Sequence, residues 1–459
     1  MLINKVTSTF GDHSSLLPLF TKDVVNSAGM TAFSYDAGGK IEAKDRFIDE
    51  FGTQAIWMGG LPGFKWAIDK SVYKLAKINP NIDVRLIKDK EQLAVAQKFA
   101  KSLADKNISE TLTTAANKST LTKNLFLGKF AAATALTLAS FFTLVKVKQN
   151  YTKKQIEKEF WAKKSEEHFY NNNVAKSPAF KAFSKVEAVN VPKADKNVSF
   201  KGLASKLSGL MFDPVQNLLL VDVGITGERL ANSRTKTEFV ETGIKEGSLL
   251  FFLYVAGKYV QKGIEKASEH FFNKPIDLHA EVLDSKYLKE AIKTGKINED
   301  VQIVKELMND KSKLYNFIYD TKNADNTVVK AAKHSGVIKT IVNGNWWQKL
   351  TGKAVNTHVI DPQKYINPAE FEDVANYLKK LADKAPKGEE ALSKFLKGCR
   401  NMKIGSVAAN MGITCLFLGL IVPYSMMKYR ENQQNGNKEF HVQSEIERQL
   451  EQNFKGRIA

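Results

Sequence analysis

Two long runs of apolar residues interrupt an otherwise mixed pattern of hydrophobic and polar positions. Residues 405–427 read GSVAANMGITCLFLGLIVPYSMM and carry no charged side chain, while residues 128–145 read GKFAAATALTLASFFTLV and carry only Lys129. A helix of about 20 residues crosses a hydrocarbon core about 30 Å thick. Both runs therefore predict transmembrane helices, with a buried core helix as the alternative for each.

Apolar positions also recur with helical spacing in residues 89–106 and 367–384, and both stretches contain LADK near their ends. Asp89 and Asn367 are candidate N-caps, and Pro368 occupies the first helical position of the second stretch. The pattern predicts two amphipathic helices with equivalent apolar stripes. The aligned stripes are Leu93, Ala96, Phe99, Ala100 and Leu103 in one and Phe371, Val374, Tyr377, Leu378 and Leu381 in the other.

These helices belong to a longer internal similarity. Each precedes an apolar run at nearly the same offset, and each follows a pair of related motifs, RFIDEFG and NPNIDVRLI in the first half, EFVETGI and NKPIDLHAEVL in the second. Any one match can arise by chance, but their shared order predicts a duplicated helical unit. We call 20–148 the first copy and 201–428 the second copy.

The sequence thus predicts an all-α integral membrane protein built from two repeated helical units, each ending in a transmembrane helix. The remaining parts are an N-terminal segment at 1–19, a charged helix and linker at 149–200, a soluble helical insertion at about 285–357, and a polar tail at 429–459. The run Leu218–Val223 fits either a strand or a buried helix.

The number of crossings depends on two shorter apolar stretches, 51–68 and 248–260. If they cross the membrane, each copy is a two-helix hairpin and the two copies share one orientation. If they do not, each copy crosses once and the copies are inverted, as in many transporters. The first 20 residues lack the long apolar segment of a signal peptide, so we expect an internal span to direct membrane insertion.

Charge favours an anionic partner. The 459 residues include 68 Lys and Arg against 49 Asp and Glu, a net charge of +19. Acidic residues are missing from 111–156 and from 391–430, so basic residues alone flank both apolar runs. This predicts binding to anionic lipid headgroups, whereas a nucleic-acid-binding protein, the less favoured alternative, would need one continuous basic face. The predicted headgroup contacts are Lys123, Lys129, Lys146, Lys148, Lys403, Lys428 and Arg430.

Small residues recur four apart in both apolar runs, a spacing that lets helices approach closely in membranes. The predicted packing ridge comprises Ala131, Ala135, Ala139, Ala408 and Gly412. The alternative is that alanine and glycine are simply common in such helices.

Patterns associated with catalysis are lacking. Two cysteines, Cys399 and Cys415, exclude a disulfide framework, and the seven histidines show no metal-ligand spacing. We therefore predict no catalytic residue, cofactor or metal. The best polar candidate is Asp222 within LLLVDVGITGERL, for which Arg229 or Arg234 could be the partner. It is either a structural ion pair or a substrate or ion site.

The sequence favours a non-enzymatic membrane protein, either a scaffold or a lipid-interacting factor. A transporter or channel built from the duplicated unit is one alternative, and it requires a polar cavity between the two copies. A membrane-tethered enzyme using the insertion is another, and it requires clustered, shifted carboxylates or histidines in a cleft.

Overall fold

The structure is a computed structural model that describes residues 2–11, 16–103, 105–171, 214–344, 348, 354–434 and 440–458. It is 84% helical, which confirms the predicted all-α class. Two helical runs, Ser119–Ser165 and Glu389–Gln433, are long and apolar enough to cross a membrane, and they contain the two predicted spans.

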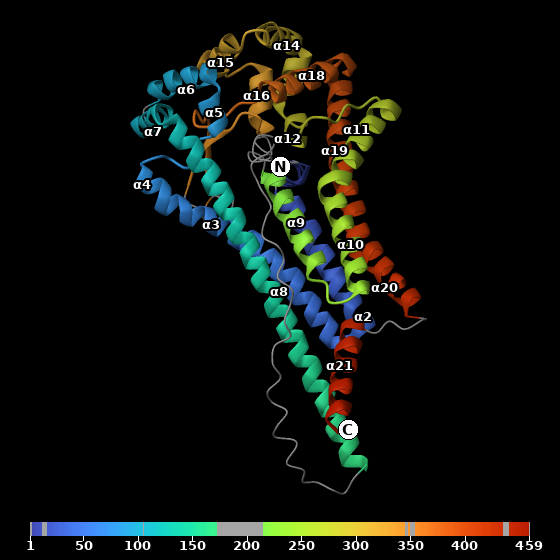
Figure 1. The fold of residues 1–459 in the computed structure, drawn as a ribbon. Coiled ribbons are helices and arrows are strands. Elements are labelled where there is room, and N and C mark those ends of the chain that lie inside the picture. The colour runs from blue at the N-terminus through green and yellow to red at the C-terminus, as the bar shows by residue number, and fades with distance from the viewer. Residues whose placement is uncertain are drawn as a thin grey trace. The chain divides into compact units, whose positions relative to one another are not determined.

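The first half of the described chain consists of helices joined by short connections (Figure 1). The predicted charged helix at 150–169 is the continuation of α8, and the predicted linker beyond residue 171 lies outside the described residues. In chain order the elements are α1 (Leu2–Gly11), α2 (Leu16–Ala55), the π-helix η1 (Ile56–Gly60), α3 (Leu61–Ile68), the π-helix η2 (Asp69–Tyr73), α4 (Lys74–Ala76), α5 (Val84–Lys88), α6 (Lys90–Ser102), α7 (Lys106–Asn117) and α8 (Ser119–Asn171).

The second half adds one small sheet to its helices. The elements are α9 (Pro214–Ala231), α10 (Lys236–Leu250), the π-helix η5 (Phe251–Ala256), α11 (Gly257–Phe272), α12 (Ala280–Leu283), α13 (Lys286–Lys293), α14 (Lys296–Leu307), α15 (Lys311–Tyr319), the 3₁₀-helix η6 (Thr321–Asn323), α16 (Thr327–His334), β1 (Thr340–Asn343), β2 (Val355–Ile360), α18 (Pro368–Lys384), α19 (Glu389–Leu416), the π-helix η7 (Phe417–Ile421), α20 (Val422–Gln433) and α21 (His441–Ile458).

The hairpin of β1 and β2 corrects the expectation that the insertion is wholly helical. The strands pair antiparallel, with Thr340 opposite Ile360 and Asn343 opposite Val355, and the register shifts between Thr340 and Val342. Their sequences, TIVN and VNTHVI, are rich in β-branched residues, which favour a pleated strand over a helix.

Internal contacts divide the chain into two compact units. Unit I comprises Met1–Lys22, Trp57–Thr137 and Phe251–Leu416, and unit II comprises Asp23–Ile56, Leu138–Leu250 and Phe417–Ala459. Each unit draws stretches from both predicted copies. The domain boundaries proposed from the sequence are not tested by this division and stay a prediction.

The two amphipathic helices supply much of the core of unit I. Asp89 accepts a hydrogen bond from the backbone N–H of Gln92 at 3.0 Å, and Asn367 accepts one from Ala369 at 3.2 Å, which confirms both predicted N-caps. Within the core, α6 packs against α15 and α14 packs against α18. Of the predicted stripes, Ala96 and Ala100 in α6 and Phe371, Val374, Leu378 and Leu381 in α18 are buried, and Val95 and Ala375 are buried beside them.

Unit II contains helical segments of α2, α8, α9, α10, α20 and α21. Gly39 (φ 71°, ψ −160°) breaks α2 into two limbs. The run Leu218–Val223, which fitted either a strand or a helix, is helical and lies inside α9. A side chain on Gly29 would lie 2.1 Å from the carbonyl oxygen of Gly419, so α2 and η7 approach at a point where only glycine fits.

Candidate functional site

The helices of unit II turn their charged faces inward. On α2, Glu42, Asp45, Arg46 and Asp49 recur with helical spacing and are at most 6% exposed, whereas Phe47 is 52% exposed. This arrangement inverts the usual amphipathic helix of a soluble protein, in which the apolar stripe faces the core.

The same inversion occurs on α10. Glu238, Glu241, Lys245 and Glu246 are buried, while Phe239 is 51% exposed. Charged side chains from several helices thus meet in the interior of unit II. We call this group the charged core; it comprises the carboxylates of Glu42, Asp45, Asp49, Glu50, Glu228, Glu238, Glu241 and Glu246 and the cations of Arg46, Lys148, Arg229, Arg234, Lys245 and Arg430.

Arg430 on α20 joins two helices at one end of the charged core. Its guanidinium donates two hydrogen bonds of 2.8 Å to the carboxylate of Glu42 on α2. It donates two more, of 2.8 and 2.9 Å, to Glu241 on α10. All three side chains are fully buried. Planar, two-pronged pairing is the strongest form of this contact and is specific to arginine.

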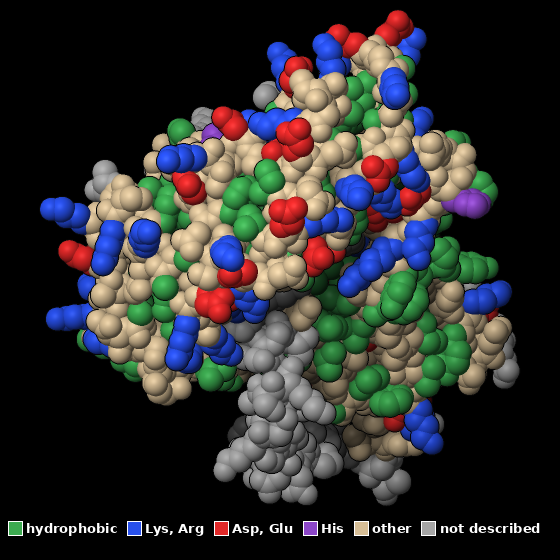
Figure 2. All heavy atoms as spheres, turned by 90° about the horizontal axis from the view of Figure 1, so that it is seen from above, with side chains coloured by type: hydrophobic (Ala, Val, Ile, Leu, Met, Phe, Trp, Pro, Cys, Tyr) green, Lys and Arg blue, Asp and Glu red, His purple; other side chains and the backbone are tan. Residues whose placement is uncertain are grey.

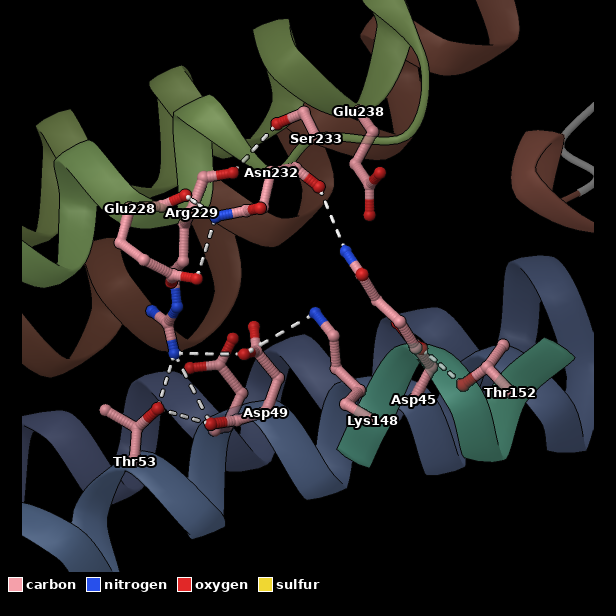
Figure 3. Close-up of polar contacts among 12 residues, drawn as sticks. Asp45, Asp49, Thr53, Lys148, Thr152, Glu228, Arg229, Asn232, Ser233 and Glu238 are labelled. Carbon is pink, nitrogen blue, oxygen red and sulfur yellow. Dashed lines mark hydrogen bonds and ion pairs between the residues drawn. The ribbon is translucent and has the colours of Figure 1, made fainter. Parts of the chain in front are cut away.

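Arg229 on α9 likewise joins carboxylates from two other helices (Figure 3). It pairs with Glu246 on α10, lies 3.3 Å from Oδ1 of Asp49 on α2, and donates a hydrogen bond of 2.6 Å to Thr53. Lys148 on α8 lies 3.5 Å from the same Asp49 oxygen. Two cations from separate helices therefore share one carboxylate.

A third group surrounds Arg234, which follows α9. The guanidinium lies 3.0 Å from Asp45 and 2.6 Å from Glu238. Thr152 on α8 donates a hydrogen bond to Asp45 at 2.5 Å. Each group links at least three helical segments, so the charged core fixes their mutual register.

Electrostatics keeps most of these carboxyls ionised. Burial alone would raise the pKa of Asp49, but the positive charges of Arg229, Lys148 and Lys245 outweigh it and hold that pKa well below its usual range. Burial is likewise outweighed at Glu238, where Arg234 lowers the pKa to about 2.

Glu228 differs from these neighbours. One of its oxygens accepts a hydrogen bond of 3.0 Å from the Asn232 amide, while the other, Oε2, is buried with no hydrogen-bond partner among the described residues. A cavity of about 20 Å³, large enough for about one water molecule, lies beside Asn232. Its walls include Arg46, Asp49, Lys148, Arg229, Asn232, Glu238, Thr242 and Lys245.

The structure brings together two of the three polar residues chosen from the sequence. Arg229 and Arg234 are both members of the charged core. The carboxylates that meet them come from α2 and α10. Asp222 is partly buried on α9 and is not among these carboxylates. Whether the group acts as a substrate or ion site is untested.

Three of the seven predicted headgroup cations point into the protein instead. Lys148 and Arg430 are buried in the charged core, and Lys403 pairs with Glu265 at 2.7 Å in unit I. They cannot reach lipid headgroups because carboxylates already hold them inside. Lys129 pairs with Asp69 and is partly exposed. Surface positions remain for Lys123, which is half-buried, and for the exposed Lys146 and Lys428.

The predicted packing ridge lies on an outer surface. Ala131, Ala135, Ala139, Ala408 and Gly412 are all exposed, and a side chain on Gly412 would meet nothing within 4 Å. The close helix contacts in unit II occur at other glycines, Gly29, Gly52 and Gly224. Spacing alone could not distinguish an inward ridge from an outward one.

Sequence reasoning missed most of the charged core, including every member from α2. The signal was present: Glu42, Asp45, Arg46 and Asp49 follow the i, i+3, i+4, i+7 spacing of one helix face. A charged stripe normally indicates a solvated face. Only the structure shows that this one is enclosed.

Unit I contains a larger groove of about 590 Å³ beside β1. Three of its charged side chains are engaged: Arg85 pairs with Asp83 at 2.7 Å, and Lys364 donates to the carbonyl of Asn81 at 2.7 Å. Among the described residues, no three His, Cys, Asp or Glu side chains are grouped so that they could hold a metal ion.

The chain matches no model of a known protein family, and it shows no significant similarity to a curated protein or to a solved structure. Its function must therefore be argued from its own geometry.

Proposed function

We propose that this chain is an integral membrane protein that acts as a scaffold or lipid-interacting factor and not as an enzyme. The inverted helices of unit II carry the proposal. Most of their buried charges are paired inside the bundle, while large apolar side chains such as Phe47 and Phe239 are exposed. Such an arrangement is unfavourable in water, whereas in a bilayer it places hydrocarbon against hydrocarbon.

The predicted spans support this placement. In their most apolar windows only 22% of the first and 33% of the second is buried within the protein. A core helix of a soluble protein would be mostly enclosed. Large apolar side chains on the outer surface of the spans include Leu136, Phe142, Leu416, Leu420 and Tyr424.

Contacts within unit II also support a common orientation for the two spans. Lys148, three residues beyond 128–145, and Arg430, three residues beyond 405–427, both bind into the charged core. The C-terminal ends of both spans therefore contact the charged core, which supports a parallel arrangement of the spans. The chain between them must then return across the membrane, and the apolar stretch 248–260, which follows the buried Glu246, is the segment placed to do so.

The duplication gains support from a reciprocal exchange of contacts. Gly29, in the first copy, packs against Gly419 in the span of the second copy. Gly224 begins a GIT sequence in the second copy that resembles the GMT sequence at Gly29, and it packs against Leu138 in the span of the first copy. Reciprocal contacts of this kind between two related halves are expected of a protein that arose by gene duplication. Together with parallel spans, these reciprocal contacts favour the arrangement of two hairpins over the inverted arrangement.

Surface charge fits lipid better than nucleic acid. On the face seen in Figure 2, basic and acidic side chains alternate and form no continuous basic surface. The cations that flank the spans, Lys123, Lys146 and Lys428, are placed for anionic headgroups instead.

The charged core also favours a second function, movement of protons or small ions. Both copies contribute to it, and buried ionisable residues in membrane proteins often mark ion pathways. The present conformation is closed, because its cavity of about 20 Å³ holds about one water molecule. A closed, extensively paired network of this kind serves a rigid scaffold better than an open path.

Extraction tests the membrane proposal. We expect the full-length protein to remain in membrane pellets after a high-pH carbonate wash and to dissolve only with detergent. Release by carbonate as a monodisperse protein without detergent would refute the proposal.

A pair of substitutions sharpens the test. Leu420 and Ile303 are 53% and 43% exposed. Leu420→Lys should reduce membrane insertion, because a lysine near the centre of a span costs about 2.5–3.5 kcal/mol. Ile303→Lys on α14 should be tolerated. Equal tolerance of both variants would mean that water, and not lipid, surrounds the second span.

A further inference from the structure

Glu228 is the one member of the charged core whose carboxylate lacks a cation of its own. The side chain is 6% exposed on α9. Its only hydrogen-bond donor given by the structure is the neutral amide of Asn232, at 3.0 Å. The second oxygen, Oε2, is buried and makes no hydrogen bond to a described residue. An ionised carboxylate held in this way is unfavourable, because burial penalises the charged form.

The cations near Glu228 already pair with other carboxylates. Arg229, on the same helix, pairs with Glu246 of α10 and with Asp49 of α2. Lys148 of α8 is also directed at Asp49, at 3.5 Å. Lys245 of α10 is taken by Glu50 and Glu246. The nearest cations therefore neutralise other carboxylates, and Asp49 adds a repulsive negative charge.

The balance of the whole charged core points the same way. It contains eight carboxylates and six cations, so full ionisation would leave two uncompensated negative charges inside unit II. Burial, reinforced by the negative charge of Asp49, raises the pKa of Glu228 to about 7 despite the opposing effects of Arg229, Lys148 and Asn232. A cavity of about 20 Å³, large enough for about one water molecule, lies beside Asn232, the hydrogen-bond partner of Glu228.

We propose that Glu228 is a proton-binding site of the charged core, taking up one proton from hydronium. The carboxylate and hydronium become a carboxylic acid and water, so no other reactant is needed. Oε2 gains a proton, and one uncompensated negative charge beside Asp49 disappears. Binding thus relieves repulsion between α9 and α2. This inference goes beyond the proposed membrane role and does not depend on it.

Infrared difference spectroscopy on the purified full-length protein tests the site directly. We expect a carbonyl stretch of a protonated carboxylic acid that is present in mildly acidic buffer and lost in mildly alkaline buffer, with a midpoint near neutral pH. Glu228→Gln should remove this band, while Glu390→Gln, at an exposed position in unit I, should leave it unchanged. A band that persists in Glu228→Gln, or no such band in the native protein, would overturn the proposal.

A second variant guards against misfolding of Glu228→Gln. Asn232→Leu removes the one hydrogen bond that favours the ionised carboxylate. The midpoint of the band should therefore move to higher pH. A midpoint that stays unchanged in folded Asn232→Leu would contradict the assignment to Glu228.

Discussion

At the scale of single residues, unit II depends on arginines that each hold two carboxylates. Arg430 is the clearest case, since it and both its partners, Glu42 and Glu241, are fully buried. Removing the positive charge of Arg430 leaves two carboxylates without their shared cation in a poorly solvated interior. Breaking a buried pair in this way costs about 3–5 kcal/mol, far more than the pair contributes relative to apolar packing.

We therefore predict that Arg430→Met lowers the free energy of unfolding by about 3–5 kcal/mol. Thermal unfolding in detergent measures this loss. Lys428→Met, which removes an exposed cation two residues away, is the matched control and should change little. Adding Glu42→Gln and Glu241→Gln to Arg430→Met should restore much of the stability. A single variant as stable as the control would show that the network is not buried.

His441 makes stability depend on pH. Burial lowers its pKa from the ordinary 6.5 to about 4, so the folded protein resists a proton that the unfolded chain accepts. Stability is therefore fully present above pH 6.5 and is lost as the pH falls towards 4, by at most about 3 kcal/mol. We predict that His441→Leu reduces this loss, as measured by unfolding at neutral and mildly acidic pH. The same change at the exposed His270 should not; an equal effect there would rule out burial as the cause.

At the scale of helices, much could be predicted from the sequence where one physical rule decides. Asp89 and Asn367 stand at the N-cap positions expected from the sequence, and both accept a hydrogen bond from the first turn of the helix that follows. Gly295 and Gly336 adopt positive φ at the ends of α13 and α16, where the apolar stripes stop. N-caps and apolar stripes depend on residues that are close together in the sequence, so the sequence alone can predict them.

The side of a helix that faces inward is not determined by nearby residues in the sequence. The charged stripe of α2 and the small-residue ridge of the spans were both visible in the sequence, but each faces the direction opposite to the conventional one. The hairpin of β1 and β2 was missed because its strands are short and flank residues rich in turn formers. Orientation depends on the solvent around the helix, which the sequence does not state.

The close approach of α2 and η7 provides a prediction at this scale. Replacing glycine by alanine inside a helix usually stabilises it by about 1 kcal/mol. Gly412→Ala, on an open surface, should follow that rule. Gly29→Ala should instead destabilise the protein, because the new methyl group would lie 2.1 Å from the carbonyl oxygen of Gly419. Thermal unfolding of the two variants gives the comparison. Changes of the same sign would mean that these helices do not touch.

At the scale of the whole molecule, the charged core and the proposed membrane placement together predict a topology that the sequence left open. Two spans whose C-terminal ends bind one network must run in the same direction, since neither could reach it from the opposite side of a bilayer. We therefore predict that positions beyond both spans, such as Lys158 and Lys428, lie on one side of the membrane. Positions before them, such as Lys118 and Glu390, should lie on the other.

Single cysteines at these four exposed positions, in a variant carrying Cys399→Ala and Cys415→Ser, allow the topology to be measured with a membrane-impermeant maleimide. In sealed vesicles of one orientation, we expect the cysteines at 158 and 428 to react alike and those at 118 and 390 to react alike, with the two pairs differing. Permeabilised vesicles, in which all four should react, provide the control. If 158 and 428 react from opposite sides, the copies are inverted, Lys148 and Arg430 cannot share one network, and the charged core loses its role in joining the two halves.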